Sequence, residues 1–231
     1  AHLTGGRLPT GMTEGVSVFG VPTTETSDTE PFVEAVESAG ARARVGTIEE
    51  LLDHGHEASS PAADASTTGA DRRSPAPDAL LGIGAAGVRA IASQQPDAPI
   101  LPIAPVPGVP SVPVDAVASA VDAVVAGTAT TEPAPLLEVA VDGVVHATAY
   151  RDVTLITAEP AKLSEFAIER TGDRHLDTVR ADGVVVATPA GSYGYAAAGD
   201  GPLLEPDTGL AVVPVAPFRT DRDRWVVPIE P

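Results

Sequence analysis

The sequence predicts an α/β domain built on a doubly wound parallel sheet, followed by a mainly β domain. Strand-like and helical segments alternate as far as residue 127, which is typical of parallel strands joined by crossover helices. Beyond residue 127, strand-like runs follow one another across turn signals without helical periodicity. The 231 residues suit one large domain or two small ones, and the core must be aliphatic because aromatic residues make up only 3%.

The α/β domain is expected over residues 15–127, and residues 1–14 are interpreted as an extension in front of it. Thr47 and Glu50 fit a capping box at the start of a helix. Residues 53–77 carry no periodicity, so we expect them to form a loop insertion. Strands are predicted at residues 15–20, 41–45, 78–81 and 99–103, and helices at residues 29–40, 47–52, 88–94 and 114–125.

The mainly β domain is expected over residues 128–231. Asp142-Gly143 is a strong signal for a two-residue hairpin turn. Ala181-Asp182-Gly183 is interpreted as a second hairpin turn. Strands are predicted at residues 136–141, 144–149, 153–157, 176–180, 184–187, 210–215 and 225–229.

Charge is the most unusual property of the composition. Thirty-two acidic residues face fourteen Lys and Arg, which gives a formal net charge of -18, and Lys162 is the only lysine. This composition favours solubility in concentrated salt, where screening weakens the repulsion between surface carboxylates, so we interpret it as a halophilic adaptation. It argues against nucleic-acid partners, which are bound mainly through Lys and Arg.

Several classes of protein are excluded by what the sequence lacks. There is no cysteine, so neither a disulfide nor a thiolate metal site can form. No apolar run approaches the roughly 20 residues that a membrane span requires. The start of the chain also lacks the basic-then-apolar pattern of a secretion signal. We therefore expect a soluble cytoplasmic protein without a membrane partner, and a homo-oligomer stays open.

The stretch from Ala181 to Tyr195 is the strongest candidate for a binding site. Residues 184–187 have the character of a buried strand, which stops at Thr188-Pro189 because proline lacks an amide donor and forces Thr188 into an extended conformation. Small residues and two tyrosines follow, and they would make a crevice wall for a flat polar ligand. An ordinary tight turn without a ligand explains the same residues equally well.

Two other patterns carry candidate chemistry. Residues 82–87 read GIGAAG between a strand and a helix, but they follow the third strand and no acid for a ribose comes about 20 residues later. This placement argues against a Rossmann NAD site and leaves phosphate contact of another kind open. His54 and His56 could bind a metal, although a solvated acidic loop explains them better. His146 and His175 are isolated, and no metal site is predicted.

An ordered set of motifs resembles the signature of the NAD kinase (ATP-NAD kinase) family. Residues 187–195 read ATPAGSYGY and resemble the ATPTGSTAY of that family, and they follow Ala181-Asp182-Gly183 as the family's motif follows ADG. Gly201-Pro202 resembles its GGP, and residues 213–218 (VPVAPF) resemble its TPIAPH. The order and spacing of these pieces are more specific than any single piece.

Two upstream segments extend the resemblance. Residues 150–153 lie where the family has LNE-V, and residues 84–88 lie where it has GGDGT. The resemblance implies two domains with NAD in the crevice between them, and transfer of the γ-phosphate of ATP, or of polyphosphate, to the 2′-hydroxyl of NAD with the help of Mg²⁺. It further implies that Gly84 and Gly87 approach phosphates and that the contacts to NAD come from Asp152, Thr188, Ser192 and Tyr195, with Asp182 close by.

The chain departs from these motifs at several positions, which makes it a divergent member. Ala86 takes the place of the Asp of GGDGT, which in that family activates the 2′-hydroxyl, so the catalytic residue is unknown. General-base assistance is typically worth about 10²–10⁴-fold in rate, so we expect reduced activity. The other departures are Arg151 for the Asn of LNE, Asp200 in GGP, and Ala190, Tyr193 and Gly194 for Thr, Thr and Ala of TPTGSTAY.

Three functions follow from this resemblance and its departures. The chain is a weakened NAD kinase, a non-catalytic NAD- or NADP-binding homologue such as a sensor or partner subunit, or a fold relic that binds nothing. The second function is supported nearly as well as the first, because phosphate transfer to the hydroxyl needs a base and Ala86 cannot supply one. Ligand binding is therefore better supported than catalysis.

Overall fold

The computed structural model describes residues 17–23, 28–53, 76–159, 162–170, 174–218 and 224–229. These residues form two compact units. The N-terminal unit holds the described residues from 17 to 105 together with Ser111–Thr131, and the C-terminal unit holds Val106–Pro110 and the described residues from Glu132 onward. The expected extension at 1–14, and residues 54–75 of the expected insertion, lie outside the described residues.

The N-terminal unit is built on a four-stranded parallel sheet in the order β2-β1-β3-β4. Its strands are β1 (Val18–Pro22), β2 (Arg42–Gly46), β3 (Ala79–Ile83) and β4 (Ile100–Ile103). Its helices are α1 (Glu30–Ser38), α2 (Ile48–Leu52), α3 (Gly84–Ala92) and α4 (Val117–Val125), the last preceded by the short 3₁₀ helix η1 (Val114–Ala116). Each element predicted from periodicity is therefore present, and the capping box of Thr47 and Glu50 is confirmed.

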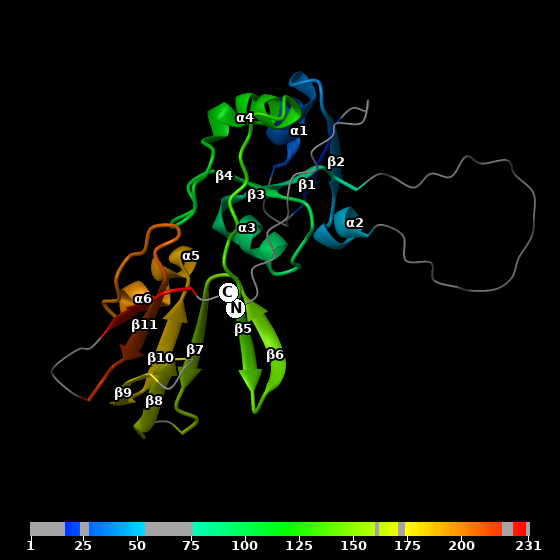
Figure 1. Ribbon diagram of the computed structural model, residues 1–231. Coiled ribbons are helices and arrows are strands. Elements are labelled where there is room, and N and C mark those ends of the chain that lie inside the picture. Colours follow the sequence, from blue (N-terminus) through cyan, green and yellow to red (C-terminus); the bar gives the residue numbers. More distant parts are fainter. Residues whose placement is uncertain are drawn as a thin grey trace, which may run out of the picture. The chain divides into compact units, whose positions relative to one another are not determined.

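Helices cover both faces of this sheet, which confirms the doubly wound architecture (Figure 1). Alternate residues of a strand point to opposite faces, so the strands feed two separate apolar clusters. In one cluster Phe19 and Leu81 pack with Val36 of α1 and Val121 of α4. In the other, Leu80 packs with residues of α2 and α3, namely Leu51 and Ile91.

Helix α3 begins four residues earlier than the sequence predicts. The prediction placed its start at Val88, but the helix starts at Gly84, so most of the GIGAAG segment is helical. Gly84 takes a φ of +64°, which glycine adopts without steric cost. Gly82 allows α3 to pack closely on β3, because a Cβ there would lie 2.7 Å from Cγ2 of Val88.

The C-terminal unit is mainly β, as predicted. Its largest sheet is antiparallel in the order β12-β11-β10-β7, and two separate hairpins, β5–β6 and β8–β9, complete it (Figure 1). No helix in the described part of the chain is long and apolar enough to cross a membrane. The elements are β5 (Leu137–Val141), β6 (Val144–Ala149), β7 (Asp152–Ile156), β8 (Ser164–Arg170), β9 (Arg174–Ala181), β10 (Gly183–Ala187), α5 (Pro189–Ser192), α6 (Tyr195–Ala198), β11 (Leu210–Val215) and β12 (Trp225–Val227).

The central strands β10 and β11 are covered on both faces. On one face Val185 and Val213 pack with Ala196 of α6. On the other face Val184 packs with Val179 of the β8–β9 hairpin. The end of β10 and the two short helices that follow it are therefore attached to strands that are covered on both faces.

One of the two predicted hairpins is confirmed and the other is wrong. Asp142 and Gly143 have φ values of +51° and +79° and join β5 to β6. In contrast, β9 pairs with β8, whereas β10 pairs with β11 and β7, so the chain passes to another sheet at Asp182. A Cβ on Gly183 would lie 2.4 Å from the Leu155 carbonyl oxygen. Gly183 therefore permits the close approach of β7 and does not form a hairpin turn.

Candidate functional site

Strand β10 ends at Ala187, and the chain then turns through α5 and α6; we call residues 188–198 the Thr188 turn. Thr188 is extended, as predicted, with φ -72° and ψ 171°. It is the N-cap of α5, and its Oγ1 accepts a hydrogen bond from the Gly191 amide at 3.2 Å. Pro189 occupies the first helical position, where its missing N–H leaves no bond unmade.

Thr188 also ties the turn to the start of β7. Its amide donates to the Arg151 carbonyl oxygen at 2.8 Å, and its hydroxyl lies 2.9 Å from the carbonyl oxygens of both Tyr150 and Arg151. The strand register pairs Ala187 with Asp152. Arg151 and Asp152, 37 and 36 positions earlier in the chain, are thereby brought beside the Thr188 turn.

Ser192 fixes the C-terminal end of α5 through its hydroxyl group. Its side chain is completely buried, its Oγ donates to the Pro189 carbonyl oxygen at 2.8 Å, and it accepts from the Leu204 amide at 3.0 Å. Thr188 is 1% exposed. Both hydroxyls are thus engaged inside the protein, where they fix the shape of the turn.

Two glycines allow the backbone to approach the turn closely. A Cβ on Gly191 would lie 1.9 Å from the Arg151 carbonyl oxygen, so α5 rests directly on the chain before β7. A Cβ on Gly108 would lie 2.4 Å from the Pro189 carbonyl oxygen, so Val106–Pro110 rests on the turn as well. Sequence reasoning missed this second contact; the one available signal is the run of prolines at residues 105–110.

Two side chains of opposite charge extend over Gly194. The Arg151 Nε donates to the Ala190 carbonyl oxygen at 3.2 Å. A Cβ on Gly194 would lie 3.2 Å from Nη2 of Arg151 and 3.5 Å from Oδ2 of Asp152. Neither charged group forms an ion pair with any residue that the structure describes. The turn therefore presents a guanidinium and a carboxylate side by side.

Tyrosines add aromatic surface to this region. Tyr193 and Tyr195 are 38% and 48% exposed, so their rings can pack on a flat ligand. Tyr150, which precedes Arg151, is buried instead. Burial raises the pKa of Tyr150 above its ordinary value of 10.0, and the neighbouring Arg151 guanidinium offsets part of this rise in the pKa.

The predicted contact residues fall into distinct places. Asp152, Thr188, Ser192 and Tyr195 gather at the Thr188 turn. Asp182 is exposed at the opposite end of β10, where its amide donates to the Val215 carbonyl oxygen at 3.0 Å. Six strand residues cover roughly 20 Å, so Asp182 lies well away from the turn.

The predicted phosphate-contacting glycines belong to the N-terminal unit. Gly84 is the first residue of α3 and Gly87 is buried against Gly82, with a Cβ position 3.5 Å from the Gly82 carbonyl carbon. Ala86 is exposed in the first turn of α3. That turn carries no acidic residue, so α3 itself supplies no substitute for the missing carboxylate.

The histidines do not assemble a metal centre in the described part of the chain. His54 and His56 lie outside the described residues. His146 is exposed on β6, and His175 Nδ1 lies 4.0 Å from a carboxylate oxygen of Glu169. Among the described residues, no three His, Asp or Glu side chains are grouped so that they could hold a metal ion.

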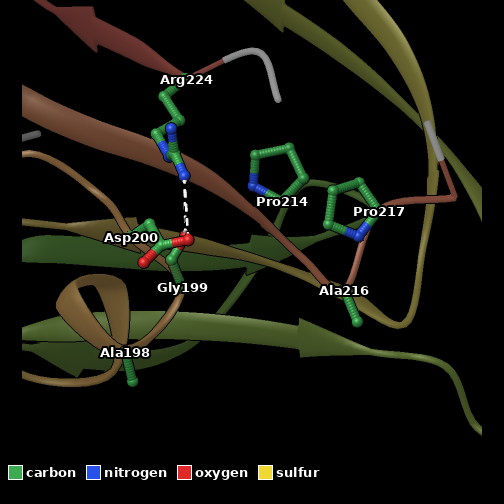
Figure 2. A pocket seen from close by; sticks show the side chains of 7 residues that line it. All are labelled: Ala198, Gly199, Asp200, Pro214, Ala216, Pro217 and Arg224. Atoms are coloured by element: carbon green, nitrogen blue, oxygen red, sulfur yellow. Dashed lines mark hydrogen bonds and ion pairs between the residues drawn. The ribbon is translucent and has the colours of Figure 1, made fainter. Parts of the chain in front are cut away.

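A cavity of about 220 Å³ lies beyond α6, where the GGP-like and TPIAPH-like segments meet. Figure 2 shows the Arg224 side chain pointing toward Asp200, and their Nη2 and Oδ2 atoms are 3.4 Å apart. Asp200 holds a φ of +56°, in the region that favours glycine. The cavity is lined by Ala198, Gly199, Asp200, Pro214, Ala216, Pro217 and Arg224.

The sequence of the C-terminal unit matches a known family. Residues 151–230 match the model of the ATP-NAD kinase C-terminal domain. This part of the chain is therefore similar to the C-terminal domain of ATP-NAD kinases. It is 42% identical over 93 residues to an NAD kinase of Methanosarcina barkeri, a match that covers 40% of this chain and 34% of that protein. It is 38% identical over 72 residues to a bifunctional NADP phosphatase/NAD kinase of Methanocaldococcus jannaschii, covering 31% of this chain and 12% of that protein.

The aligned part of the chain spans about a third of the length of the Methanosarcina NAD kinases that it matches. The fold likeness is wider. An NAD kinase from Archaeoglobus fulgidus, solved in complex with ATP, superposes with a TM-score of 0.60 at 20% identity, covering 92% of this chain and 77% of that one. A yeast NADH kinase complexed with NADH gives a TM-score of 0.60 at 16% identity, covering 92% and 70%. These structures confirm the NAD kinase fold.

Proposed function

We propose that the protein binds NAD at the Thr188 turn and is an NAD kinase-like phosphotransferase with weakened activity. The reaction would move the γ-phosphate of ATP to the 2′-hydroxyl oxygen of NAD, which gives NADP and releases ADP and a proton. The observation that carries the proposal is the turn itself, in which Thr188 hydrogen-bonds to the Arg151 carbonyl oxygen and Ala187 pairs with Asp152 at the start of β7. The names of the relatives, and the ATP and NADH in the two solved structures, support nucleotides as the ligands.

The side chains at the turn suit a dinucleotide. The Asp152 carboxylate can accept hydrogen bonds from ribose hydroxyls, and the exposed ring of Tyr195 can stack on a base. Thr188 and Ser192 hold the turn in the shape that presents these groups. Gly84 and Gly87 are proposed to approach the phosphates, and Asp182 remains a proposed contact from the opposite end of β10. Mg²⁺ would enter with ATP as part of the substrate.

Ala86 is the reason to propose weakened activity. A methyl group cannot take the proton from the 2′-hydroxyl, and α3 carries no acid in its first turn. This observation also favours a second candidate function, in which the protein binds NAD or NADP without catalysis, as a sensor or as the partner subunit of an active kinase.

Restoring the acid separates the two functions. NADP formation from NAD and ATP-Mg is measured for the native protein and for Ala86→Asp. The buffer is concentrated salt, because the net charge of -18 supports a salty cytoplasm as the setting. A weak kinase shows slow NADP formation that rises about 10²–10⁴-fold in Ala86→Asp. A non-catalytic binder shows no product in the native form but binds NAD in a calorimetric titration. Absence of both product and binding in both forms rejects the proposed function.

A further inference from the structure

Arg151 gives the Thr188 turn a feature that the resemblance does not imply. Resting on the proposed dinucleotide site, we infer that Arg151 is a specificity-determining residue, which binds the 2′-phosphate and makes the site prefer NADP to NAD. The native protein would thus retain the phosphorylated dinucleotide.

The guanidinium of Arg151 is held in place by one hydrogen bond, and its other N–H donors can contact a ligand. Its Nε is held by the Ala190 carbonyl oxygen at 3.2 Å, which fixes the plane of the group. A guanidinium has five N–H donors. The four on its terminal nitrogens donate to no residue that the structure describes, and no described carboxylate forms an ion pair with the guanidinium. These donors form the planar fork that pairs with the oxygens of a phosphate.

Gly194 makes room for this guanidinium. The resembling motif has Ala at this position, and an Ala Cβ would lie 3.2 Å from Arg151 Nη2, which is tighter than almost all such contacts. The same motif set has Asn at the position of Arg151. The two departures therefore lie next to each other: glycine at 194 leaves the Arg151 guanidinium in place, whereas an Ala Cβ would require it to shift by a few tenths of an ångström.

The neighbouring carboxylate indicates which phosphate the site takes. Arg151 Nη2 and Asp152 Oδ2 both lie within 3.5 Å of the same Gly194 Cβ position, so they face one small region of a ligand. A carboxylate recognises a free ribose hydroxyl, and a nearby arginine accommodates a 2′-phosphate. A ribose that is phosphorylated on O2′ and free on O3′ offers these two groups on adjacent carbons. That is the adenosine ribose of NADP.

Calorimetric titrations with NAD and NADP test the inference on the full chain. The native protein should bind NADP about 10- to 100-fold more tightly than NAD, which is the range for charge-assisted hydrogen bonds. Arg151→Asn should bring the two dissociation constants within about threefold by weakening NADP alone, and Arg151→Lys, which keeps the charge without the fork, should fall in between. Gly194→Ala should reduce the preference less than Arg151→Asn does, because the methyl group requires the guanidinium to shift by only a few tenths of an ångström.

Arg180→Gln is the matched control, because it removes the same charge from an exposed arginine that pairs with Glu165 on the β8–β9 hairpin. It should leave the preference for NADP unchanged. Inorganic phosphate at millimolar concentration should not displace NADP from the native protein. The dissociation constant of NADP should also rise more steeply with salt than that of NAD, and this difference should vanish in Arg151→Asn.

Three results would overturn the inference and leave the proposed site standing. They are equal binding of NAD and NADP by the native protein, an unchanged preference in both Arg151→Asn and Arg151→Lys, and displacement of NADP by phosphate alone. If the native protein binds neither NAD nor NADP, the proposed site itself is wrong. Unfolding followed by the fluorescence of Trp225 shows whether a variant is folded. If Arg151→Asn is unfolded, Arg151→Lys and Gly194→Ala decide the question.

Discussion

Replacement of Gly191 by Ala tests whether the Thr188 turn is held against β7 as the structure indicates. A Cβ at this position would lie 1.9 Å from the oxygen and 2.4 Å from the carbon of the Arg151 carbonyl. Both atoms are backbone, so no side-chain rotation relieves the overlap. The contact becomes ordinary only beyond about 3.4 Å, and α5 must move away from β7 to reach it.

The magnitude follows from what this movement breaks. Overpacking of a tight site typically costs about 1–3 kcal/mol. The movement also lengthens the bonds from the Thr188 amide and hydroxyl to the carbonyl oxygens of Arg151 and Tyr150, at about 1 kcal/mol for each bond. We therefore expect Gly191→Ala to lower the free energy of unfolding of the C-terminal unit by about 3–5 kcal/mol.

Urea unfolding followed by the fluorescence of Trp225 is the suitable assay, because the only tryptophan lies on β12 of this unit. Gly143→Ala is the matched control: it adds the same methyl group at a position with open space, so only its φ of +79° opposes the change, at about 1–2 kcal/mol. A loss for Gly191→Ala no larger than that for Gly143→Ala would refute the close approach of α5 to β7.

Two further predictions use the same unfolding assay. Thr188→Val should lower the free energy of unfolding by about 1–3 kcal/mol, because it removes the N-cap of α5 and leaves the Tyr150 carbonyl oxygen without its donor. Thr188→Ser keeps the hydroxyl and should lower it by less than half as much. Equal losses for the two variants would show that the hydroxyl does not stabilise the turn. Burial raises the pKa of Tyr150, so the folded protein keeps this proton at a pH where the unfolded chain releases it, and stability should fall as the pH rises through 10 toward the raised pKa. Tyr150→Phe should show a smaller fall, and identical pH profiles would contradict this assignment.

The N-terminal unit was predictable because its signals are local. Helical stripes such as the one containing Val117 and Val121 need only spacing within one segment, and the capping box of Thr47 and Glu50 needs only four residues. The start of α3 was less accessible, because a run of Gly and Ala has too little side-chain pattern to separate a loop from a first helical turn.

Pairing between distant strands was harder to predict. Ala181-Asp182-Gly183 has the composition of a hairpin turn, yet β9 pairs with β8, a strand at residues 164–170 that is absent from the predicted set although its burial alternates. Similarly, the order of motifs indicated that Asp152 and Thr188 belong to one site, whereas the meeting of Arg151 with Gly194 depends on the register of β7 against β10. No spacing in the sequence reports that register.

The central claim is that the Thr188 turn binds NAD, and a titration of three forms of the protein tests it most directly. NAD is titrated calorimetrically into the native protein, Asp152→Asn and Glu138→Gln, where the last removes an exposed charge from β5 of the same unit. We predict that Asp152→Asn binds NAD about tenfold more weakly or worse, because a charged hydrogen-bond acceptor is lost, and that Glu138→Gln binds as the native protein does. Equal affinity in all three forms, or no binding by the native protein, would contradict the claim.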